Sequence, residues 1–175
     1  QNEVGLSFCL PCLGGRYANG TGTKVCKECD KGQHQDSSGN KTTCLGCKVG
    51  QYMSGEGAVN CLDCNPGTYA NDTGTKDCKE CDQGHHQDAP GNETCLDCKV
   101  GQYMSGEGAV NCFPCSPGKF SSKEGSVECD KCPTGYLQPD PEQSECDEVE
   151  AGSIVAKGGS SSVVVPSGSK IDGTA

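Results

Sequence analysis

The sequence predicts a small disulfide-rich fold: an elongated tandem array of about eight 17-residue units, each with one disulfide, short β-hairpins and turns, and little regular secondary structure. Three observations support this prediction: 17 cysteines among 175 residues, the even spacing of those cysteines, and a shortage of large apolar side chains. The chain has 5 Tyr, 3 Phe and no Trp. A conventional hydrophobic core cannot form from so few, so disulfides or metal ions must stabilise the fold.

The cysteines recur as Cys-x-x-Cys pairs that begin at positions 9, 26, 44, 61, 78, 95, 112 and 129, and Cys146 follows alone. Each step is 17 residues long except one of 18. A period this short is typical of a linear array rather than a globule.

The residues between the pairs repeat as well. The sequence KVGQYMSGEGAVNC occurs unchanged at 48–61 and at 99–112. Three residues after the second cysteine of each pair stands a glycine in all eight units, and ten residues after it a glycine in seven of them. Glycine at a fixed offset predicts a positive φ or a close approach of the backbone. Five residues after that cysteine stands Tyr, His, Phe or Leu, which we expect to pack over a disulfide.

Two disulfide pairings suit this spacing. In a crossed scheme, Cys9 joins Cys26 and Cys12 joins Cys29, which uses the units in twos. In a ladder scheme, the second cysteine of each pair joins the first cysteine of the next, and Cys9 is left unassigned. The lone Cys146 favours the ladder, although spacing alone does not fix connectivity. The ladder pairs are Cys12–Cys26, Cys29–Cys44, Cys47–Cys61, Cys64–Cys78, Cys81–Cys95, Cys98–Cys112, Cys115–Cys129 and Cys132–Cys146.

Zinc is the main alternative to disulfides, because two Cys-x-x-Cys pairs separated by 13 or 14 residues approach the spacing of Cys₄ zinc sites. The even pitch of the pairs, the acidic surface and the glycosylation signals favour disulfides. We therefore expect no metal site and no cofactor.

The run CLDCNPGTYANDTGTKDCKEC at 61–81 resembles the ephrin-receptor-like cysteine-rich repeats of extracellular proteins. Each loop is also similar to the single-disulfide module of TNF-receptor ectodomains, and similar cysteine arrays occur in surface proteins of protists. The TNF-receptor resemblance implies the Cys12–Cys26 pairing and its seven equivalents. The sequence lacks the second, multi-disulfide module of those receptors, so their ligand site does not transfer.

Four Asn-x-Ser/Thr sequons predict N-linked glycans, at Asn19, Asn40, Asn71 and Asn92. They occupy two repeated positions, one shared by Asn19 and Asn71 and the other by Asn40 and Asn92. Together with the disulfides, they predict an extracellular or cell-surface location.

The formal net charge of −10 argues against nucleic-acid binding, which needs clustered Lys and Arg. The sequence contains no run of about 18–20 apolar residues, the length that a membrane-spanning helix needs, so we expect no direct membrane insertion. No catalytic motif is present, so we expect no enzyme. Of the three histidines, His34 and His86 take the aromatic position and His85 a variable one, which favours packing over metal ligation.

We expect three regions: an N-terminal lead at 1–8, the cysteine-rich array at 9–147, and a Ser/Gly/Val-rich tail at 148–175. In the tail, 154–156 and 163–165 flank KGGSSS and could form a loose hairpin. The tail is then a linker, or a strand given to a following domain or a neighbouring subunit. The predicted function is an extracellular structural repeat protein, a glycosylated stalk, coat or filament subunit that self-associates or contacts a neighbouring subunit. The alternative is a receptor or adhesion ectodomain that binds a protein ligand.

Overall fold

The computed structural model describes residues 11–20, 25–39, 41–150 and 152–164. The chain divides into two compact parts: Gln1–Glu80 with Ala89–Cys95, called the first part, and Cys81–Asp88 with Leu96–Ala175, called the second part. Both parts are made of tandem disulfide-linked units, which confirms the predicted class of small disulfide-rich array. Cys9, Asn40 and the lead at 1–8 lie outside the described residues.

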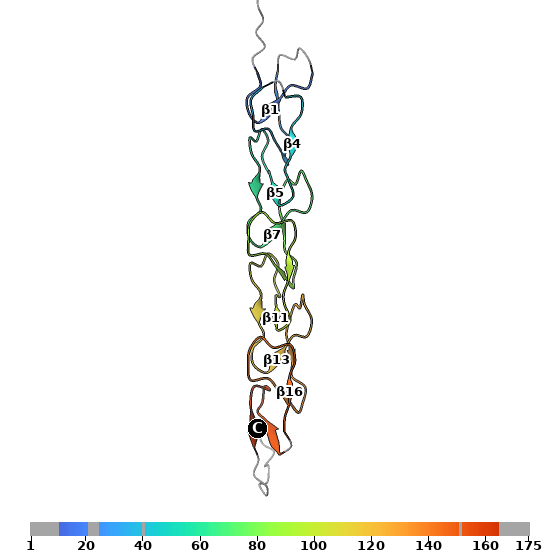
Figure 1. Cartoon of the computed structure of the whole chain (residues 1–175), viewed down its shortest axis with the longest axis vertical. Helices are drawn as coiled ribbons and strands as arrows, with labels where there is room; N and C mark the ends of the chain where they lie inside the picture. Colours follow the sequence, from blue (N-terminus) through green and yellow to red (C-terminus); the bar gives the residue numbers. More distant parts are fainter. Residues whose placement is uncertain (1–10, 21–24, 40, 151, 165–175) are drawn as a thin grey trace, which may run out of the picture. The chain divides into compact units, whose positions relative to one another are not determined.

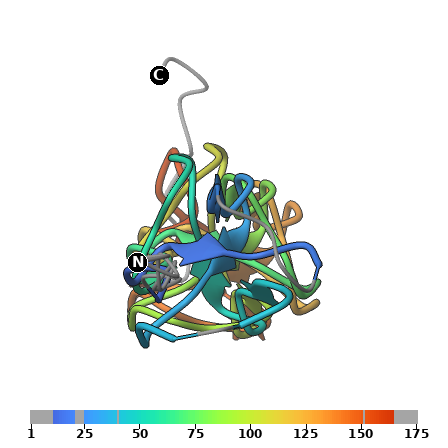
Figure 2. The ribbon, with the colours of Figure 1, turned by 90° about the horizontal axis from the view of Figure 1, so that it is seen from above.

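Each unit contributes one two-stranded antiparallel sheet, and loops make up the rest of it (Figures 1 and 2). No helix occurs in the described ranges. The paired strands are β1 (Arg16–Tyr17) with β2 (Lys27–Glu28), β3 (Gln33–His34) with β4 (Leu45–Gly46), β5 (Gln51–Tyr52) with β6 (Leu62–Asp63), β7 (Thr68–Tyr69) with β8 (Lys79–Glu80), β9 (His85–His86) with β10 (Leu96–Asp97), β11 (Gln102–Tyr103) with β12 (Phe113–Pro114), β13 (Lys119–Phe120) with β14 (Asp130–Lys131), β15 (Tyr136–Leu137) with β16 (Asp147–Glu148), and β17 (Ser153–Val155) with β18 (Ser162–Val164).

A tight turn starts each hairpin, and the sequence explains it. In the unit that begins at Cys64, the Thr68 N–H donates to the Asn65 carbonyl at 3.0 Å. Gly67 lies between them with φ +82°, and Pro66 precedes it. Proline followed by a glycine with positive φ is the preferred sequence of a type II turn. The turn brings β7 back so that Tyr69 pairs with Lys79 across the sheet.

The disulfides form the centre of each unit. Seven bridges join the second cysteine of one pair to the first cysteine of the next, as in the ladder scheme: Cys12–Cys26, Cys29–Cys44, Cys47–Cys61, Cys64–Cys78, Cys98–Cys112, Cys115–Cys129 and Cys132–Cys146. Cys81 and Cys95 are also disulfide-bonded. Since Cys26 bonds Cys12, the crossed scheme does not occur. The largest fully buried side chains of the described residues are second cysteines of these pairs, together with Ser121.

Main-chain hydrogen bonds join each unit to the next within both parts. They always connect the same positions of the unit, so the connection from one unit to the next depends little on which side chains are present. From the unit of Cys47 to that of Cys64 there are four: Gly50 N to Ala70 O (2.7 Å), Cys64 N to Gly50 O (2.9 Å), Met53 N to Thr75 O (3.1 Å) and Gly74 N to Cys47 O (2.7 Å).

Units two steps apart also meet, at the first of the two repeated glycines. A Cβ added at Gly50 would lie 2.0 Å from the carbonyl oxygen of Gly91, two units further along. Gly15 and Gly32 have the same relation to Gly57 and Gly74. This close approach is the reason for glycine at the repeated position. We call this glycine position the glycine seat. The carbonyl group that it meets, two units further along, is called its occupant.

The residues after Cys146 repeat the geometry of a unit without a disulfide. The Val149 N–H donates to the Gly135 carbonyl at 2.9 Å, as a second cysteine does elsewhere. Gly152 follows three residues later, and β17 then pairs with β18. This hairpin lies where one was predicted, but β17 ends at Val155, before Ala156, and Val165 lies outside the described residues. In this register Val149 replaces the second cysteine and Ser162 the closing one. We call 149–164 the ninth unit.

Candidate interaction and modification sites

A buried position follows directly after the aromatic one, six residues after the second cysteine. In chain order it holds Ala18, Gln35, Met53, Ala70, Gln87, Met104, Ser121 and Gln138. Six of these eight are buried, and Ala18 and Met53 are half-buried. This position could not be predicted from the sequence, because its residues share no obvious chemistry. One signal was available: none of the eight is charged.

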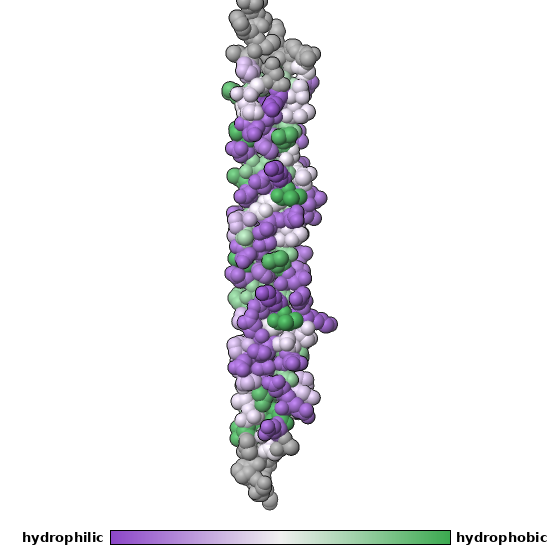
Figure 3. All heavy atoms as spheres, in the orientation of Figure 1, coloured by the Kyte–Doolittle hydropathy of each residue, from purple (hydrophilic) through white to green (hydrophobic). Residues whose placement is uncertain are grey.

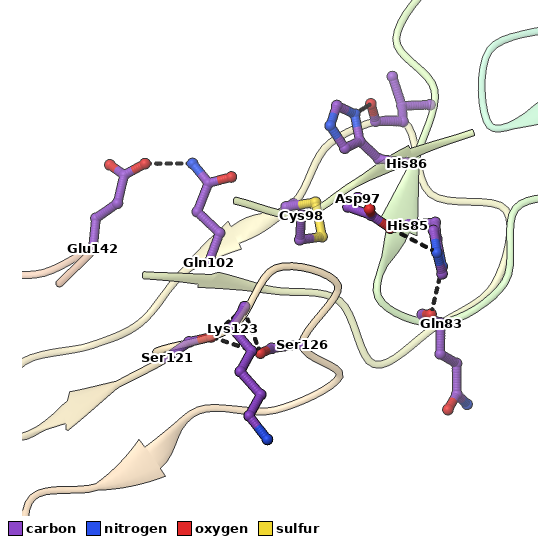
Figure 4. Close-up of a disulfide and its surroundings, with 12 residues drawn as sticks. Gln83, His85, His86, Asp97, Cys98, Gln102, Ser121, Lys123, Ser126 and Glu142 are labelled. Atoms are coloured by element: carbon purple, nitrogen blue, oxygen red, sulfur yellow. Dashed lines mark hydrogen bonds and ion pairs between the residues drawn. A yellow bond between two sulfur atoms is a disulfide. The ribbon is translucent and has the colours of Figure 1, made fainter. Parts of the chain in front are cut away.

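The polar members of this position satisfy their buried groups locally. Gln35 is 2 % exposed, and its Nε2 donates to the Thr43 carbonyl at 2.9 Å. The Nε2 of Gln138 donates to the Glu145 carbonyl at 2.8 Å. The Ser121 hydroxyl lies 2.7 Å from that of Ser126 (Figure 4). A buried amide or hydroxyl costs free energy unless it is hydrogen-bonded, so these positions maintain loop structure and do not face a ligand.

The aromatic position is half-buried in all eight disulfide-linked units. His34 lies against a bridge, as predicted, because its Nδ1 is 3.3 Å from the Cys61 sulfur of the next unit. Two tyrosines contact the residue opposite them in the hairpin. The Tyr103 and Phe113 ring centroids are 6.2 Å apart, and the Lys79 ammonium lies 6.0 Å from the Tyr69 ring centroid. These contacts stabilise hairpins.

The histidines offer little to a metal ion. The ligand atoms of His34, Cys47 and Cys61 lie within 4.8 Å of one another. However, the two sulfurs are bonded to each other, and a metal requires the free thiolate. His85 contacts Asp97 through Nε2 at 2.9 Å and the Gln83 carbonyl through Nδ1 at 2.9 Å (Figure 4). His86 Nδ1 is 3.2 Å from the Val110 carbonyl.

The sequon asparagines differ in their surroundings. Asn19 and Asn71 are exposed, and the Asn71 side-chain oxygen accepts a hydrogen bond from Lys79 at 3.0 Å. Asn92 is half-buried, and its Nδ2 donates to the Ala89 carbonyl at 3.1 Å. Since Nδ2 is the atom that carries an N-linked glycan, Asn19 and Asn71 are the more accessible acceptors.

Large apolar side chains are also exposed to solvent at the first residue after a closing cysteine. Leu45 is 55 % exposed, Leu62 53 %, Leu96 51 % and Phe113 59 %. Figure 3 shows apolar residues set singly among hydrophilic ones. Exposed apolar residues of this kind are normal when they are scattered, so they do not define a binding face by themselves.

The fold and these positions define a class of protein, the disulfide-rich tandem-repeat module. A family model described as tyrosine-protein kinase ephrin type A/B receptor-like matches four overlapping segments, 50–92, 67–115, 89–128 and 101–146. Together they cover residues 50–146, more than half of the 175-residue chain. The chain belongs to this ephrin-receptor-like family. Such repeats form non-catalytic modules of extracellular receptor-type or repeat proteins.

No curated protein matches the chain. Within the described ranges, no helix has the length and apolar character needed to cross a membrane.

Proposed function

We propose that this protein is secreted or displayed at the cell surface and acts as a structural repeat module, a glycosylated stalk, coat or filament subunit. One observation carries the proposal. Within each part, main-chain hydrogen bonds join successive units at fixed positions, and glycine seats bring units two steps apart into contact. Because this connection between units requires no particular side chain, it can be repeated along the chain, and the number of units sets the extent of the array.

The surface chemistry supports the same function. The formal net charge of −10 keeps repeated modules soluble. The exposed acceptors Asn19 and Asn71 occupy the same position in their units, so glycans there would recur at a fixed interval along the chain. We propose that the partner is a neighbouring subunit, either another copy of this chain or another component of the same coat or filament.

The test is the state of association of the oxidised protein. Chain secreted from a eukaryotic host would be studied by sedimentation and small-angle scattering over a range of concentrations, and by electron microscopy. We expect concentration-dependent association into regular assemblies. Monomers at every concentration, together with tight binding of a soluble protein ligand, would contradict the proposal and favour the receptor or adhesion function.

A further inference from the structure

The exposed sequon at Asn71 follows directly after the strand that carries an aromatic ring. Tyr69 is the last residue of β7 and is half-buried. Ala70 is buried, whereas all three residues of the sequon, Asn71, Asp72 and Thr73, are exposed. The acceptor asparagine therefore lies two residues beyond a tyrosine ring, at the point where the chain leaves the strand.

The side chain of Lys79 contacts both the ring and the asparagine. Lys79 lies opposite Tyr69 in the hairpin of β7 and β8. Its ammonium lies 6.0 Å from the Tyr69 ring centroid and 3.0 Å from the side-chain oxygen of Asn71. Because one nitrogen contacts both groups, the asparagine side chain and the ring lie on the same side of the hairpin. A single sugar residue attached to Asn71 can therefore reach the ring.

The lysine and a glycan use different atoms of the asparagine amide. Lys79 donates its hydrogen bond to Oδ1 of Asn71, whereas an N-linked glycan is attached through Nδ2. The lysine therefore holds the amide beside the ring without occupying the attachment atom. Its ammonium is also at the outer limit of a cation–π contact with Tyr69, so it does not pack closely on the ring.

The same three residue types occur together in one other disulfide-linked unit. Tyr17, Asn19 and Lys27 hold the equivalent positions, and Tyr17 lies opposite Lys27 in the hairpin of β1 and β2. In the other six disulfide-linked units, the residue two positions after the aromatic one is Asp, Ser or Pro, and the residue opposite the aromatic one is Leu, Phe or Asp. Among these eight units, an acceptor asparagine at this spacing thus occurs only together with the tyrosine and the lysine.

We propose that the ring of Tyr69 is a docking surface for the first N-acetylglucosamine of a glycan on Asn71. This inference rests on the proposed glycosylation of that asparagine. The C–H groups on one face of the sugar carry partial positive charge, and they pack favourably on the electron-rich face of an aromatic ring. The glycan is then fixed against its own unit, and its first sugar adds an apolar contact to a hairpin that is too short to be stable alone.

Hydrogen exchange of the full oxidised chain, secreted from a eukaryotic host, tests this contact. An endoglycosidase trims the glycans to a single N-acetylglucosamine, and glycopeptide mass spectrometry verifies its presence on Asn71. We expect the Thr68 and Ala70 amides, which donate to the carbonyls of Asn65 and Asn92, to exchange about two- to tenfold more slowly in this form than in Asn71→Gln. Equal exchange with the sugar present would overturn the inference and leave the proposed function intact. A chain without sugar on Asn71 would contradict the glycosylation itself, and the inference would fail with it.

A matched pair of variants separates the ring from the fold, and the array itself holds both replacements at the aromatic position, in Phe120 and Leu137. Tyr69→Phe keeps the aromatic face, so the sugar should still slow the exchange. Tyr69→Leu keeps a large apolar side chain without a ring, so Asn71 with its sugar and Asn71→Gln should then exchange alike. An equal effect of the sugar in the Phe and Leu variants would contradict the docking.

NMR spectroscopy gives a signature that a purely structural role of Tyr69 would not produce. Ring currents should shift the C–H signals of the first sugar on Asn71 upfield in the unsubstituted chain and in Tyr69→Phe, and not in Tyr69→Leu. Unshifted sugar signals in the unsubstituted chain would overturn the inference even if the Leu variant failed to fold. A peptide map of the unreduced protein, with the Cys64–Cys78 bridge as its marker, verifies that each variant is folded.

Discussion

At the scale of single residues, the array depends on positions that leave no room for a Cβ atom. Gly84 has φ +80°, and a Cβ there would lie 2.1 Å from the carbonyl oxygen of Gly125 and 2.8 Å from its carbonyl carbon. The left-handed conformation costs a non-glycine residue roughly 1–2 kcal/mol. The obstructing atoms are main chain, so the seat cannot adapt by rotating a side chain, and the clash adds to that cost.

Gly84→Ala should therefore destabilise the second part by more than about 2 kcal/mol. The measurement is the hydrogen exchange of the Cys98 and Met104 amides, which both lie in the next unit, together with the thermal unfolding midpoint. Gly106→Ala is the control, because no atom lies within 4 Å of its Cβ position and its φ is not positive. Similar losses in the two variants would refute the role of the seat.

The buried glutamines lead to a second prediction. Gln138 is 5 % exposed and holds its loop through the Glu145 carbonyl. Gln138→Glu removes the donor and introduces a buried charge at neutral pH, which should cost about 1–3 kcal/mol. Gln143→Glu makes the same change at an exposed side chain and should cost little. Thermal unfolding of the two variants at neutral pH gives the comparison, and equal midpoints would contradict the account.

Glycan attachment should follow the exposure of the acceptors. We expect Asn19 and Asn71 to be occupied to a greater extent than Asn92, whose Nδ2 is hydrogen-bonded to the Ala89 carbonyl. Glycopeptide mass spectrometry of protein secreted from a eukaryotic host measures the occupancy of each site. Asn71→Gln should remove one glycan and leave the other sites unchanged. Higher occupancy at Asn92 than at Asn71 would count against the structural argument.

Much of this residue-level detail could be predicted from the sequence, and the reason is repetition. The glycine positions were evident because one is shared by all eight copies and the other by seven, and the positive φ of Gly67 follows from the Pro-Gly turn. The buried position of Gln35 and Ser121 was not found, because burial there depends on loop closure and not on apolar character. The contact of His85 with Asp97 was missed too, since it requires the strand register that pairs them.

At the scale of the element, the hairpin and its bridge form one unit. Spacing alone allowed both disulfide schemes, because each brings cysteines together through loops of similar length. The hairpin decides between them. It places Cys64 and Cys78 with their Cα atoms 5.8 Å apart, within the range that a disulfide requires. The ninth unit keeps this hairpin without the bridge. The valine-rich segments of the tail predicted a hairpin, but its equivalence to a disulfide-linked unit became clear only from the register of β17 and β18.

An engineered bridge tests that register. In the ninth unit Val149 takes the place of Cys64 and Ser162 that of Cys78, so Val149→Cys with Ser162→Cys should form a disulfide on air oxidation. A loop of this length should add about 3 kcal/mol in the chain-entropy account. Val149→Cys with Val163→Cys is the control, because neighbouring residues of a strand point to opposite faces. Iodoacetamide labelling and peptide mapping give the result. Free thiols in the first variant, or equal oxidation in both, would contradict the register.

At the scale of the whole molecule, covalent bridges replace the hydrophobic core that the composition cannot supply. The buried residues are mostly cysteines of the bridges and small or polar side chains between them. Closing a loop of about 15 residues removes roughly 3 kcal/mol of unfolded-state entropy in the chain-entropy model. Hairpins of two residues a strand are not stable in isolation, so we expect the disulfide-linked units to unfold when the bridges are reduced.

Reduction and metal chelation should therefore have opposite outcomes. Dithiothreitol should abolish the protection of the Gly50, Gly84 and Gly101 amides against hydrogen exchange, whereas EDTA should leave it unchanged. If the cysteines instead held zinc, EDTA would unfold the chain and iodoacetamide would label the untreated protein readily. Reoxidation after dithiothreitol is removed should restore the protection together with the Cys47–Cys61 and Cys98–Cys112 peptides in an unreduced map. Protection that survives full reduction would show that main-chain bonding and the glycine seats hold the array without the bridges.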